Sequence, residues 1–122
     1  MKIYKCEICG RIIDELTAGA GVPVCCGKPM TEMIPGTSDG AAEKHVPVYE
    51  VEGNKVSVTV GSVAHPMADV HYIEWIAIET TSGMQRKMLK PAQEPKADFL
   101  MAEGEELVAV YAYCNLHGFW KA

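Results

Sequence analysis

Residues 72–79 read Tyr-Ile-Glu-Trp-Ile-Ala-Ile-Glu, a β-branched and aromatic run that is typical of a strand buried on both faces. Residues 107–113, Leu-Val-Ala-Val-Tyr-Ala-Tyr, predict a second strand of the same kind. Val56, Val58 and Val60 alternate with smaller or polar residues, the period of two that indicates a strand with one buried face.

Turn signals separate these runs, with Glu-Gly-Asn at residues 52–54 and Thr-Ser-Gly at residues 81–83. No stretch of eleven or more residues shows the 3.6-residue period of an amphipathic helix. Several short strands joined by turns at this spacing predict a mainly β chain built around an antiparallel β-sandwich.

The N-terminal segment contains few large apolar residues, too few for a core of its own. A segment below about 40 residues usually needs a metal, a disulfide or a partner chain to fold. Residues 35–40, Pro-Gly-Thr-Ser-Asp-Gly, are rich in turn formers and indicate a linker. We therefore expect two domains, a small metal domain over residues 1–36 and a β-sandwich over residues 37–122.

The bulk composition excludes several classes of function. The chain has 122 residues, 48% of them hydrophobic, with a net charge of −5 and no run of Lys or Arg. Neither a nucleic acid nor an anionic membrane is expected as a partner. The N-terminus lacks the apolar region of a secretory signal, and no apolar run approaches the roughly 20 residues of a spanning helix. These observations predict a cytoplasmic protein.

The five cysteines and four histidines are segregated along the chain. Four cysteines precede residue 27, whereas every histidine and the fifth cysteine follow residue 44. Thiols stay reduced in the cytoplasm, and an odd count that includes the adjacent Cys25 and Cys26 argues against a disulfide framework. The distribution predicts two separate metal sites.

The predicted first site consists of Cys6, Cys9, Cys25 and Cys26. Cys6 and Cys9 form a metal knuckle, because a two-residue gap lets both thiolates reach one ion and Gly10 allows the tight turn. The second pair has no gap, so its bite is narrower and the tetrahedron should be distorted. Four thiolates select zinc or iron. The spacing is compatible both with a structural zinc ribbon and with an iron site that holds one electron.

The predicted second site consists of His45, His65, His71, Cys114 and His117. His65 and His71 bracket a proline-containing loop, and the Asn and Gly of residues 114–118 signal a turn that brings Cys114 and His117 to one ion. One thiolate and four neutral imidazoles leave a ferrous site with a net positive charge, which attracts a small anion. Five protein ligands also leave one octahedral position open, as in a catalytic site.

Other metalloproteins share parts of this pattern. A blue-copper electron carrier also places Cys and His near the end of a β-sandwich, but it usually adds an axial Met, and no Met follows His117. A structural zinc protein would have no redox chemistry. The alternative function is therefore a small metal-binding electron-transfer protein without enzymatic turnover.

Seven motifs carry a resemblance to a known family: YKCEICG (4–10), VCCGKPM (24–30), DGAAEKHVPV (39–48), VGSVAHPM (60–67), HYIEWI (71–76), LKP (89–91) and YCNLHGFWKA (113–122). With these motifs in this order, the chain resembles the desulfoferrodoxins, the two-iron superoxide reductases, over nearly its full length. The resemblance implies a desulforedoxin-like (rubredoxin-type) metal domain followed by an immunoglobulin-like antiparallel β-sandwich, usually in a homodimer.

The same resemblance implies two irons per chain, one held by the four N-terminal cysteines. The other iron would have Cys114 as its axial ligand and four equatorial imidazoles, from His45, His65, His71 and His117. Superoxide would bind opposite the thiolate and be reduced by one electron to hydrogen peroxide, with no release of dioxygen, as a protection against oxidative stress.

Two charged neighbours and an electron donor complete what the resemblance implies. Lys44 matches the family's lysine beside the open position, where an ammonium draws in the anion and supports protonation of the product. Glu43 matches the residue that takes the sixth position once the iron is ferric, and Gly40, Ala41 and Ala42 give that loop small residues suited to a lid. A rubredoxin is the electron donor that the family implies.

Overall fold

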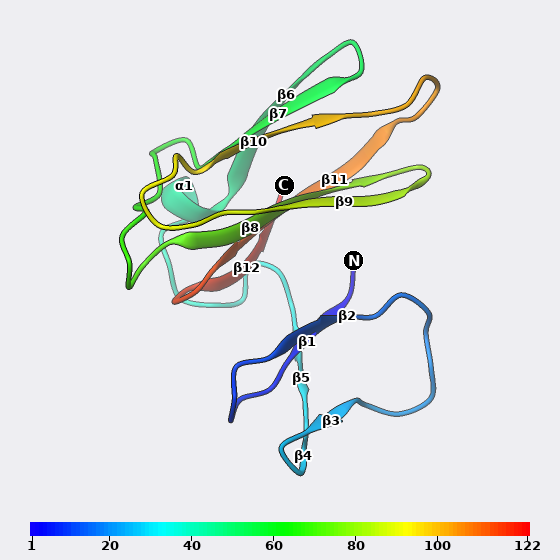
Figure 1. The fold of residues 1–122 in the computed structure, drawn as a ribbon, viewed down its shortest axis with the longest axis vertical. Coiled ribbons are helices and arrows are strands. Elements are labelled where there is room, and N and C mark those ends of the chain that lie inside the picture. The colour runs from blue at the N-terminus through cyan, green and yellow to red at the C-terminus, as the bar shows by residue number, and fades with distance from the viewer. The chain divides into compact units, whose positions relative to one another are not determined.

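The computed structural model describes residues 1–122, which divide into two compact units, Met1–Ile34 and Pro35–Ala122 (Figure 1). We call these unit 1 and unit 2 and describe each by itself. No helix of the chain is long and apolar enough to cross a membrane.

Unit 1 contains five short strands: β1 (Ile3–Lys5), β2 (Ile12–Asp14), β3 (Val24–Cys25), β4 (Lys28–Pro29) and β5 (Thr31–Met33). Strand β1 lies between β2 and β5 in an antiparallel sheet, while β3 and β4 pair as a separate hairpin. The core is small: Tyr4, Cys6 and Met30 are buried, and Ile13 and Cys25 pack against them. So little buried apolar surface agrees with the expectation that this segment needs a metal.

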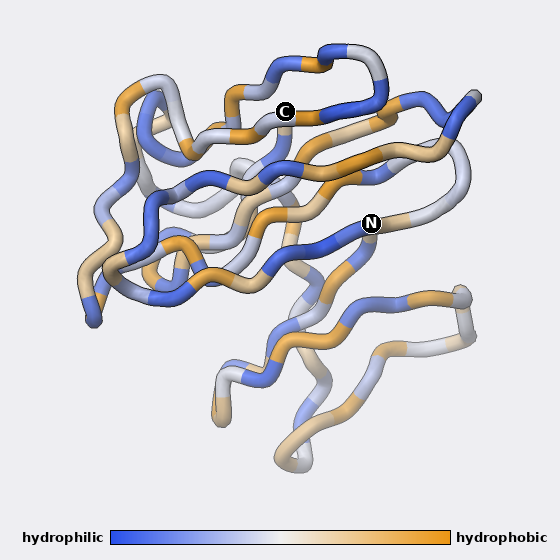
Figure 2. The backbone as a smooth tube through the Cα atoms, turned by 45° about the horizontal axis from the view of Figure 1, so that its top comes forward, coloured by the Kyte–Doolittle hydropathy of each residue, from blue (hydrophilic) through white to orange (hydrophobic).

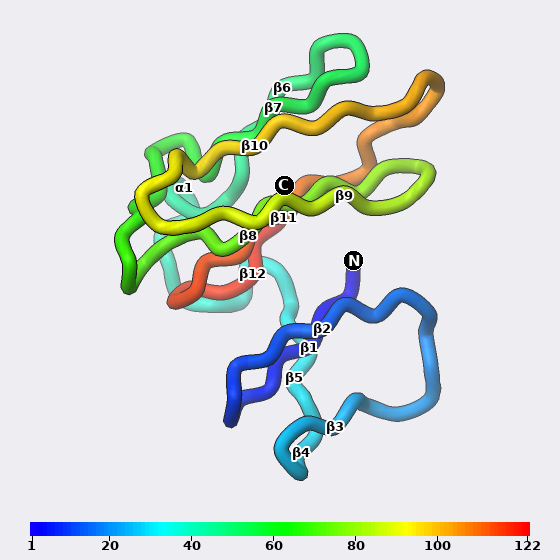
Figure 3. Tube along the Cα trace, in the orientation of Figure 1, coloured from blue at the N-terminus to red at the C-terminus, as the bar shows by residue number.

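Unit 2 contains one helical turn and seven strands: α1 (Ala42–His45), β6 (Pro47–Glu52), β7 (Lys55–Val60), β8 (Ile73–Thr80), β9 (Gly83–Met88), β10 (Lys96–Leu100), β11 (Leu107–Cys114) and β12 (Gly118–Lys121). The strands form two antiparallel sheets, in the orders β10-β7-β6 and β12-β11-β8-β9. Figure 3 shows how the chain passes from one sheet to the other. Strands of the first sheet are coloured green to orange, and those of the second yellow-green to red.

The core of unit 2 lies between the two sheets. Val56, Val58 and Val60 of β7 belong to one buried cluster with Ile76 and Ile78 of β8, and further members come from β10 and β11. Along the tube of Figure 2, hydrophobic residues are interleaved with hydrophilic ones, as strands with one buried face require. The prediction of a mainly β chain, with a small four-cysteine unit followed by antiparallel sheets, is confirmed.

The three strands read from the sequence are present as β7, β8 and β11, with ends shifted by one residue. Strand β9 gave no sequence signal, since it reads Gly-Met-Gln-Arg-Lys-Met and its side chains are mostly exposed. It is an edge strand that pairs only with β8, so its side chains need no regular alternation.

One end of unit 2 gathers the segments that carry the histidines. Strand β7 ends there at Val60, β8 begins there at Ile73, and β11 ends there at Cys114, whose register partners are Ile73 on β8 and Gly118 on β12. The predicted linker is attached to strand β12, because the Gly36 amide donates a hydrogen bond to the Phe119 carbonyl at 2.8 Å.

Candidate metal centres

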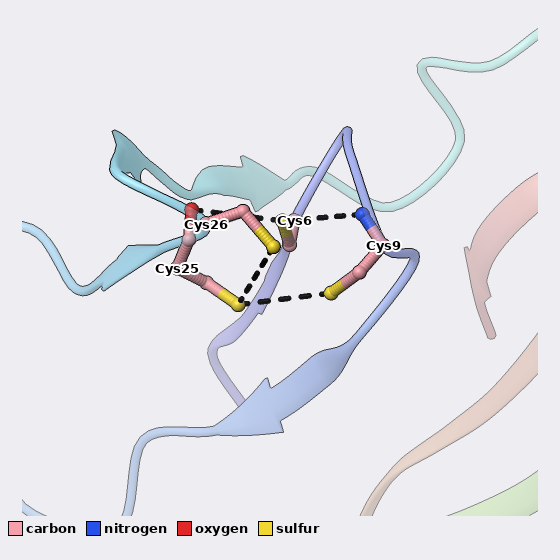
Figure 4. A group of neighbouring side chains, drawn as sticks. All are labelled: Cys6, Cys9, Cys25 and Cys26. Atoms are coloured by element: carbon pink, nitrogen blue, oxygen red, sulfur yellow. Dashed lines mark hydrogen bonds between the residues drawn. The ribbon is translucent and has the colours of Figure 1, made fainter.

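The four N-terminal cysteines converge in unit 1. Cys6 and Cys9 stand on the turn that follows β1, and Cys25 and Cys26 stand on the β3–β4 hairpin (Figure 4). The four sulfur atoms all lie within 4.8 Å of one another, with Cys9 Sγ 3.7 Å and Cys26 Sγ 4.0 Å from Cys25 Sγ. The four residues that the sequence places in the first site therefore lie in one group, and four thiols at this spacing suit a metal ion.

The adjacent pair reaches one point because Cys26 leaves the strand conformation. Consecutive residues of a strand point to opposite faces. Cys26 has a φ of +53°, in the left-handed region, and Gly27 follows with a φ of +74°. This bend turns the Cys26 sulfur back beside that of Cys25.

Hydrogen bonds from backbone amides and from neighbouring thiols give Cys6 and Cys26 different pKa values. The Cys9 amide donates to Cys6 Sγ at 3.5 Å, and this hydrogen bond lowers the pKa of Cys6 to about 6. The hydrogen bond to Cys9 and the other crowded thiols raise the pKa of Cys26 to about 12. Four thiolates so close together repel one another, so a bound cation is what allows all of them to ionise.

The second group lies at the histidine-bearing end of unit 2. His45 ends α1, His65 and His71 stand on the loop between β7 and β8, and Cys114 ends β11. One ligand atom from each of these four residues lies within 4.8 Å of all the others. Three segments that are distant in the sequence thus supply one compact set of nitrogen and sulfur atoms.

His117 stands beside this group rather than inside it. Its ring centroid is 4.8 Å from that of His45 and 5.0 Å from that of His71. The compact set comprises His45, His65, His71 and Cys114. The prediction that His117 is a fourth imidazole ligand therefore stays a prediction.

Backbone carbonyls orient three of the four imidazoles. Nδ1 of His45 bonds the Ala41 carbonyl at 2.8 Å, and Nδ1 of His65 bonds the Pro66 carbonyl at 2.7 Å. Nδ1 of His117 bonds the Asp39 carbonyl at 2.7 Å. A carbonyl oxygen only accepts, so the proton of each neutral ring resides on Nδ1 and Nε2 keeps its lone pair for a metal.

Burial favours the neutral form of the His45, His65 and His71 rings. It lowers the pKa of His65 to about 4 and also lowers the pKa of His45 and His71. The neighbouring imidazole of His117 and, to a smaller extent, the positive charge of Lys44 lower the pKa of His45 and His71 further. Neutral imidazole is the form that binds a metal.

Cys114 is fully buried, with none of its surface exposed. Burial raises the pKa of its thiol, while hydrogen bonds from the amides of His117 and Leu116 act in the opposite direction. The tight turn after β11 thus points these two amides at the sulfur. A thiolate at this position is stabilised by the two amides and by any cation that the imidazoles hold.

Two observations test whether a metal fits this group. Nε2 of His71 is buried without a hydrogen-bond partner, and Nε2 of His45 lies 3.1 Å from Nε2 of His65. Because Nδ1 of His45 and Nδ1 of His65 each donate their proton to a carbonyl, the two Nε2 atoms face each other with their lone pairs, which repel. A cation removes both conflicts, and a set of imidazoles and one thiolate suits a transition metal.

Glu43 and Lys44 are exposed on α1, directly before His45. Their turn rests on the segment that leads to His65, because the Glu43 carbonyl accepts from the Val63 amide at 2.9 Å and from Ser62 Oγ at 3.3 Å. A Cβ on Gly61 would lie only 2.6 Å from the same carbonyl oxygen. Glycine at this position is thus required for α1 to sit where it does.

Sequence reasoning missed several residues that shape this group. Trp120 stacks on His45 with ring centroids 5.0 Å apart, and its Nε1 donates to the His117 carbonyl at 3.0 Å. Gly61 carries no sequence signal beyond its residue type, because its role depends on a contact with a segment 18 residues away. Asn115 was read only as a turn former, although its side chain makes two hydrogen bonds across the site.

Fold and site together define a class: a metalloprotein with a four-cysteine unit and a separate antiparallel β-sandwich that carries a histidine–cysteine centre. Comparisons with known proteins make the class specific. The model of the desulfoferrodoxin N-terminal domain matches residues 1–33, and the desulfoferrodoxin model matches residues 37–122. The chain therefore belongs to the desulfoferrodoxin family.

Individual relatives agree over the whole length. A desulfoferrodoxin from Nitratidesulfovibrio vulgaris is 54% identical, over 99% of this chain and 94% of its own. A desulfoferrodoxin homolog from Archaeoglobus fulgidus is 52% identical, over 100% of this chain and 96% of its own. The crystal structure of the superoxide reductase from Treponema pallidum superposes with a TM-score of 0.81 at 34% identity, covering 98% of each chain.

Proposed function

We propose that this chain is a superoxide reductase, which reduces superoxide to hydrogen peroxide with one electron and two protons and releases no dioxygen. The observation that carries the proposal is the group of buried imidazole nitrogens around the Cys114 sulfur, next to an exposed lysine. Relatives of similar length and fold bear the names desulfoferrodoxin and superoxide reductase, which supports the same activity here.

Both metal sites are proposed to hold iron, two ions per chain. His45, His65, His71 and His117 hold the second ion together with Cys114, and the four N-terminal cysteines hold the first. Iron in the second site would supply the single electron that superoxide takes up. Neutral imidazoles add no charge and the thiolate adds only one negative charge, so the residues leave the centre positive and attractive to an anion.

Lys44 and Glu43 are proposed to handle the substrate and the product. The Lys44 ammonium, whose charge reaches His45 and His71, attracts superoxide and donates hydrogen bonds to oxygen atoms that gain negative charge. Glu43 precedes it on the same exposed turn, where a hard carboxylate suits ferric iron and helps displace the product. Glu43→Ala should leave the encounter rate nearly intact and alter the resting ferric spectrum.

The first site is proposed to relay electrons, because four thiolates change little in geometry when iron gains or loses one electron. A small electron carrier of the rubredoxin kind is the donor that we expect. The chain is further proposed to act as a homodimer in the cytoplasm, where thiols remain reduced.

The decisive experiment measures metal content and absorption spectra of the purified full chain, oxidised and reduced, followed by superoxide consumption with an oxygen electrode. We expect two irons per chain, thiolate charge-transfer bands, and superoxide loss without dioxygen release. Zinc in the second site, or dioxygen release at half the rate of superoxide loss, contradicts the proposal. Two redox-active irons without superoxide consumption would identify the alternative, an electron-transfer protein.

A further inference from the structure

His71 differs from the other three histidines in how its ring is held. Rings of His45, His65 and His117 each bond a carbonyl through Nδ1. The His71 ring has no such bond, and its buried Nε2 also lacks a partner. The direction in which this nitrogen points therefore depends on the backbone that carries the ring.

The Asn115 side chain grips that backbone on both sides of His71. Oδ1 of Asn115 accepts a hydrogen bond from the Tyr72 amide at 2.9 Å, and Nδ2 donates to the Val70 carbonyl at 3.0 Å. The Asn115 amide adds a third bond, to the Tyr72 carbonyl at 3.2 Å. An amide side chain suits this position, because its planar group carries an acceptor and a donor side by side and needs no change of protonation.

These bonds complete the hydrogen bonding of the loop. The amide and the carbonyl of His71 itself pair with Ala68, at 3.1 and 2.9 Å. Every backbone polar group from the Val70 carbonyl to the Tyr72 carbonyl thus has a partner, and three of the five partners belong to Asn115. Asn115 follows Cys114 directly, so the residue that fixes the loop is anchored to the sulfur ligand.

We propose that Asn115 is the positioning residue for His71: its side-chain amide clamps the Val70 carbonyl and the Tyr72 amide and so fixes the distance between His71 Nε2 and the Cys114 sulfur. Asn115 thus orients the His71 ring, as the three carbonyls orient the rings of the other histidines. The inference rests on the metal site proposed above but not on turnover of superoxide. Partners of this kind typically change metal affinity by about 10- to 100-fold when they are removed.

The test compares Asn115→Leu, which keeps the size and loses both side-chain bonds, with wild type and with Val108→Ala. Val108 lies on β11, the strand that leads to Asn115, at the end away from the site, and it is 57% exposed. Full-length protein loaded with iron and oxidised to the ferric state is challenged with a chelator, and loss of iron is followed separately at the two sites by their thiolate charge-transfer bands. We expect Asn115→Leu to lose the second-site iron about tenfold faster or more, with a shifted band, and both sites of Val108→Ala to match wild type.

The outcomes separate this inference from the proposed function. If wild type itself holds no iron in the second site, the proposed function fails. If wild type holds it and Asn115→Leu releases it at an unchanged rate with an unchanged band, the clamp is disproved. Equal acceleration at both sites would reveal a general folding defect and would also overturn the positioning role. Should Asn115→Leu fail to fold, Asn115→Asp keeps the acceptor for Tyr72 and loses the donor to Val70, so an unaltered band in that variant would disprove the clamp.

Discussion

The two units of this chain differ in how far apart in the sequence their candidate metal ligands lie and in how deeply these ligands are buried. In unit 1 the ligands are close in sequence, and Cys9 and Cys26 are exposed at the surface of a unit whose core holds three buried residues. In unit 2 the candidate ligands come from three distant segments, and His45, His65 and Cys114 are at least 97% buried at the end of a core of twelve residues. Unit 1 depends on its metal site to hold its strands together. The core of unit 2 can hold the residues of its site in place without a metal.

This difference decides what each metal can do. A closed set of four thiolates leaves no position for a substrate, so a site of that kind can stabilise a fold or carry an electron. Imidazoles and one thiolate, set beside a lysine, can bind an anion. The predictions below test the contrast, in order of decreasing expected effect.

Removal of both metals should unfold unit 1 and leave unit 2 folded. Four buried apolar residues cannot offset the conformational entropy of 34 ordered residues, whereas the sandwich keeps its own core. Amide NMR spectra of the chelated full chain should show collapsed signals for residues 1–34 and dispersed signals for β6 to β12. Dispersed signals in both units would show that the four-cysteine unit folds without metal.

Cys114→Ser should abolish superoxide consumption while the absorption of the first site persists. A serine hydroxyl is not ionised at neutral pH and is a hard ligand, so the buried soft anion at the end of β11 is lost. Cys9→Ser is the matched variant in unit 1, and it should remove the first site's absorption while that of the second remains. Turnover by Cys114→Ser at the wild-type rate would overturn the role of this thiolate.

Gly61→Ala should destabilise unit 2 by about 1–3 kcal/mol, because a new methyl group would press against the Glu43 carbonyl. The same change should loosen α1, which carries His45. Gly19→Ala is the control, since a Cβ there meets nothing within 4 Å. Denaturant unfolding of the metal-free chain measures the effect on unit 2, and equal midpoints for the two variants would count against the tight contact.

Lys44→Ala should slow the reaction with superoxide about three- to tenfold at low ionic strength, because one charge that steers the anion is removed. The difference should nearly vanish at about 1 M salt, where the screening length falls to about 3 Å. Lys55→Ala makes the same change of charge at the far end of β7 and should have little effect. Pulse radiolysis at several salt concentrations measures the rates, and a loss independent of salt would exclude steering.

Thr80→Val should raise the pKa of Glu105 toward its ordinary value. The Thr80 hydroxyl donates to one carboxylate oxygen and the Ala102 amide donates to the other at 2.6 Å, and both bonds lower this pKa in the folded chain. A carboxyl group whose folded pKa is depressed stabilises the fold above its unfolded pKa, and that contribution is lost as the pH falls through the folded value.

The stability lost in Thr80→Val should therefore be greater at pH 7 than at pH 3. An NMR titration of the Glu105 carboxyl carbon checks the pKa, with Thr59→Val on β7 as the control for the loss of a hydroxyl. An unmoved titration would place the cause of the depressed pKa elsewhere. A change in the pKa of Glu105 without any change at the histidines would show that this end of the sandwich is stabilised independently of the metal site.

The sequence allowed the first site to be predicted almost completely, because its ligands lie in two short motifs. The chemistry of thiols and the Cys6–Cys9 spacing identify a metal knuckle before any fold is known. What could not be foreseen was the left-handed backbone at Cys26, since a non-glycine residue rarely adopts it without tertiary support.

For the second site, residue types and order predicted which residues would meet, and three histidines and Cys114 do meet. Their surroundings could not be predicted, because carbonyls such as that of Ala41 and side chains such as Trp120 act from other segments. His117 shows the limit, since the sequence places it in the ligand set and the structure places its ring just beside the compact group.

By itself, then, the amino-acid sequence determined a mainly β chain with two kinds of metal-binding residues in separate segments, since side-chain chemistry and strand periodicity are local properties. Only the tertiary structure decided that His45, His65, His71 and Cys114 share one end of a sandwich. It also decided which carbonyls orient the imidazoles and that Asn115 spans the loop of His71. These are contacts between residues up to 78 positions apart, and strand pairing brings them together where no local pattern can.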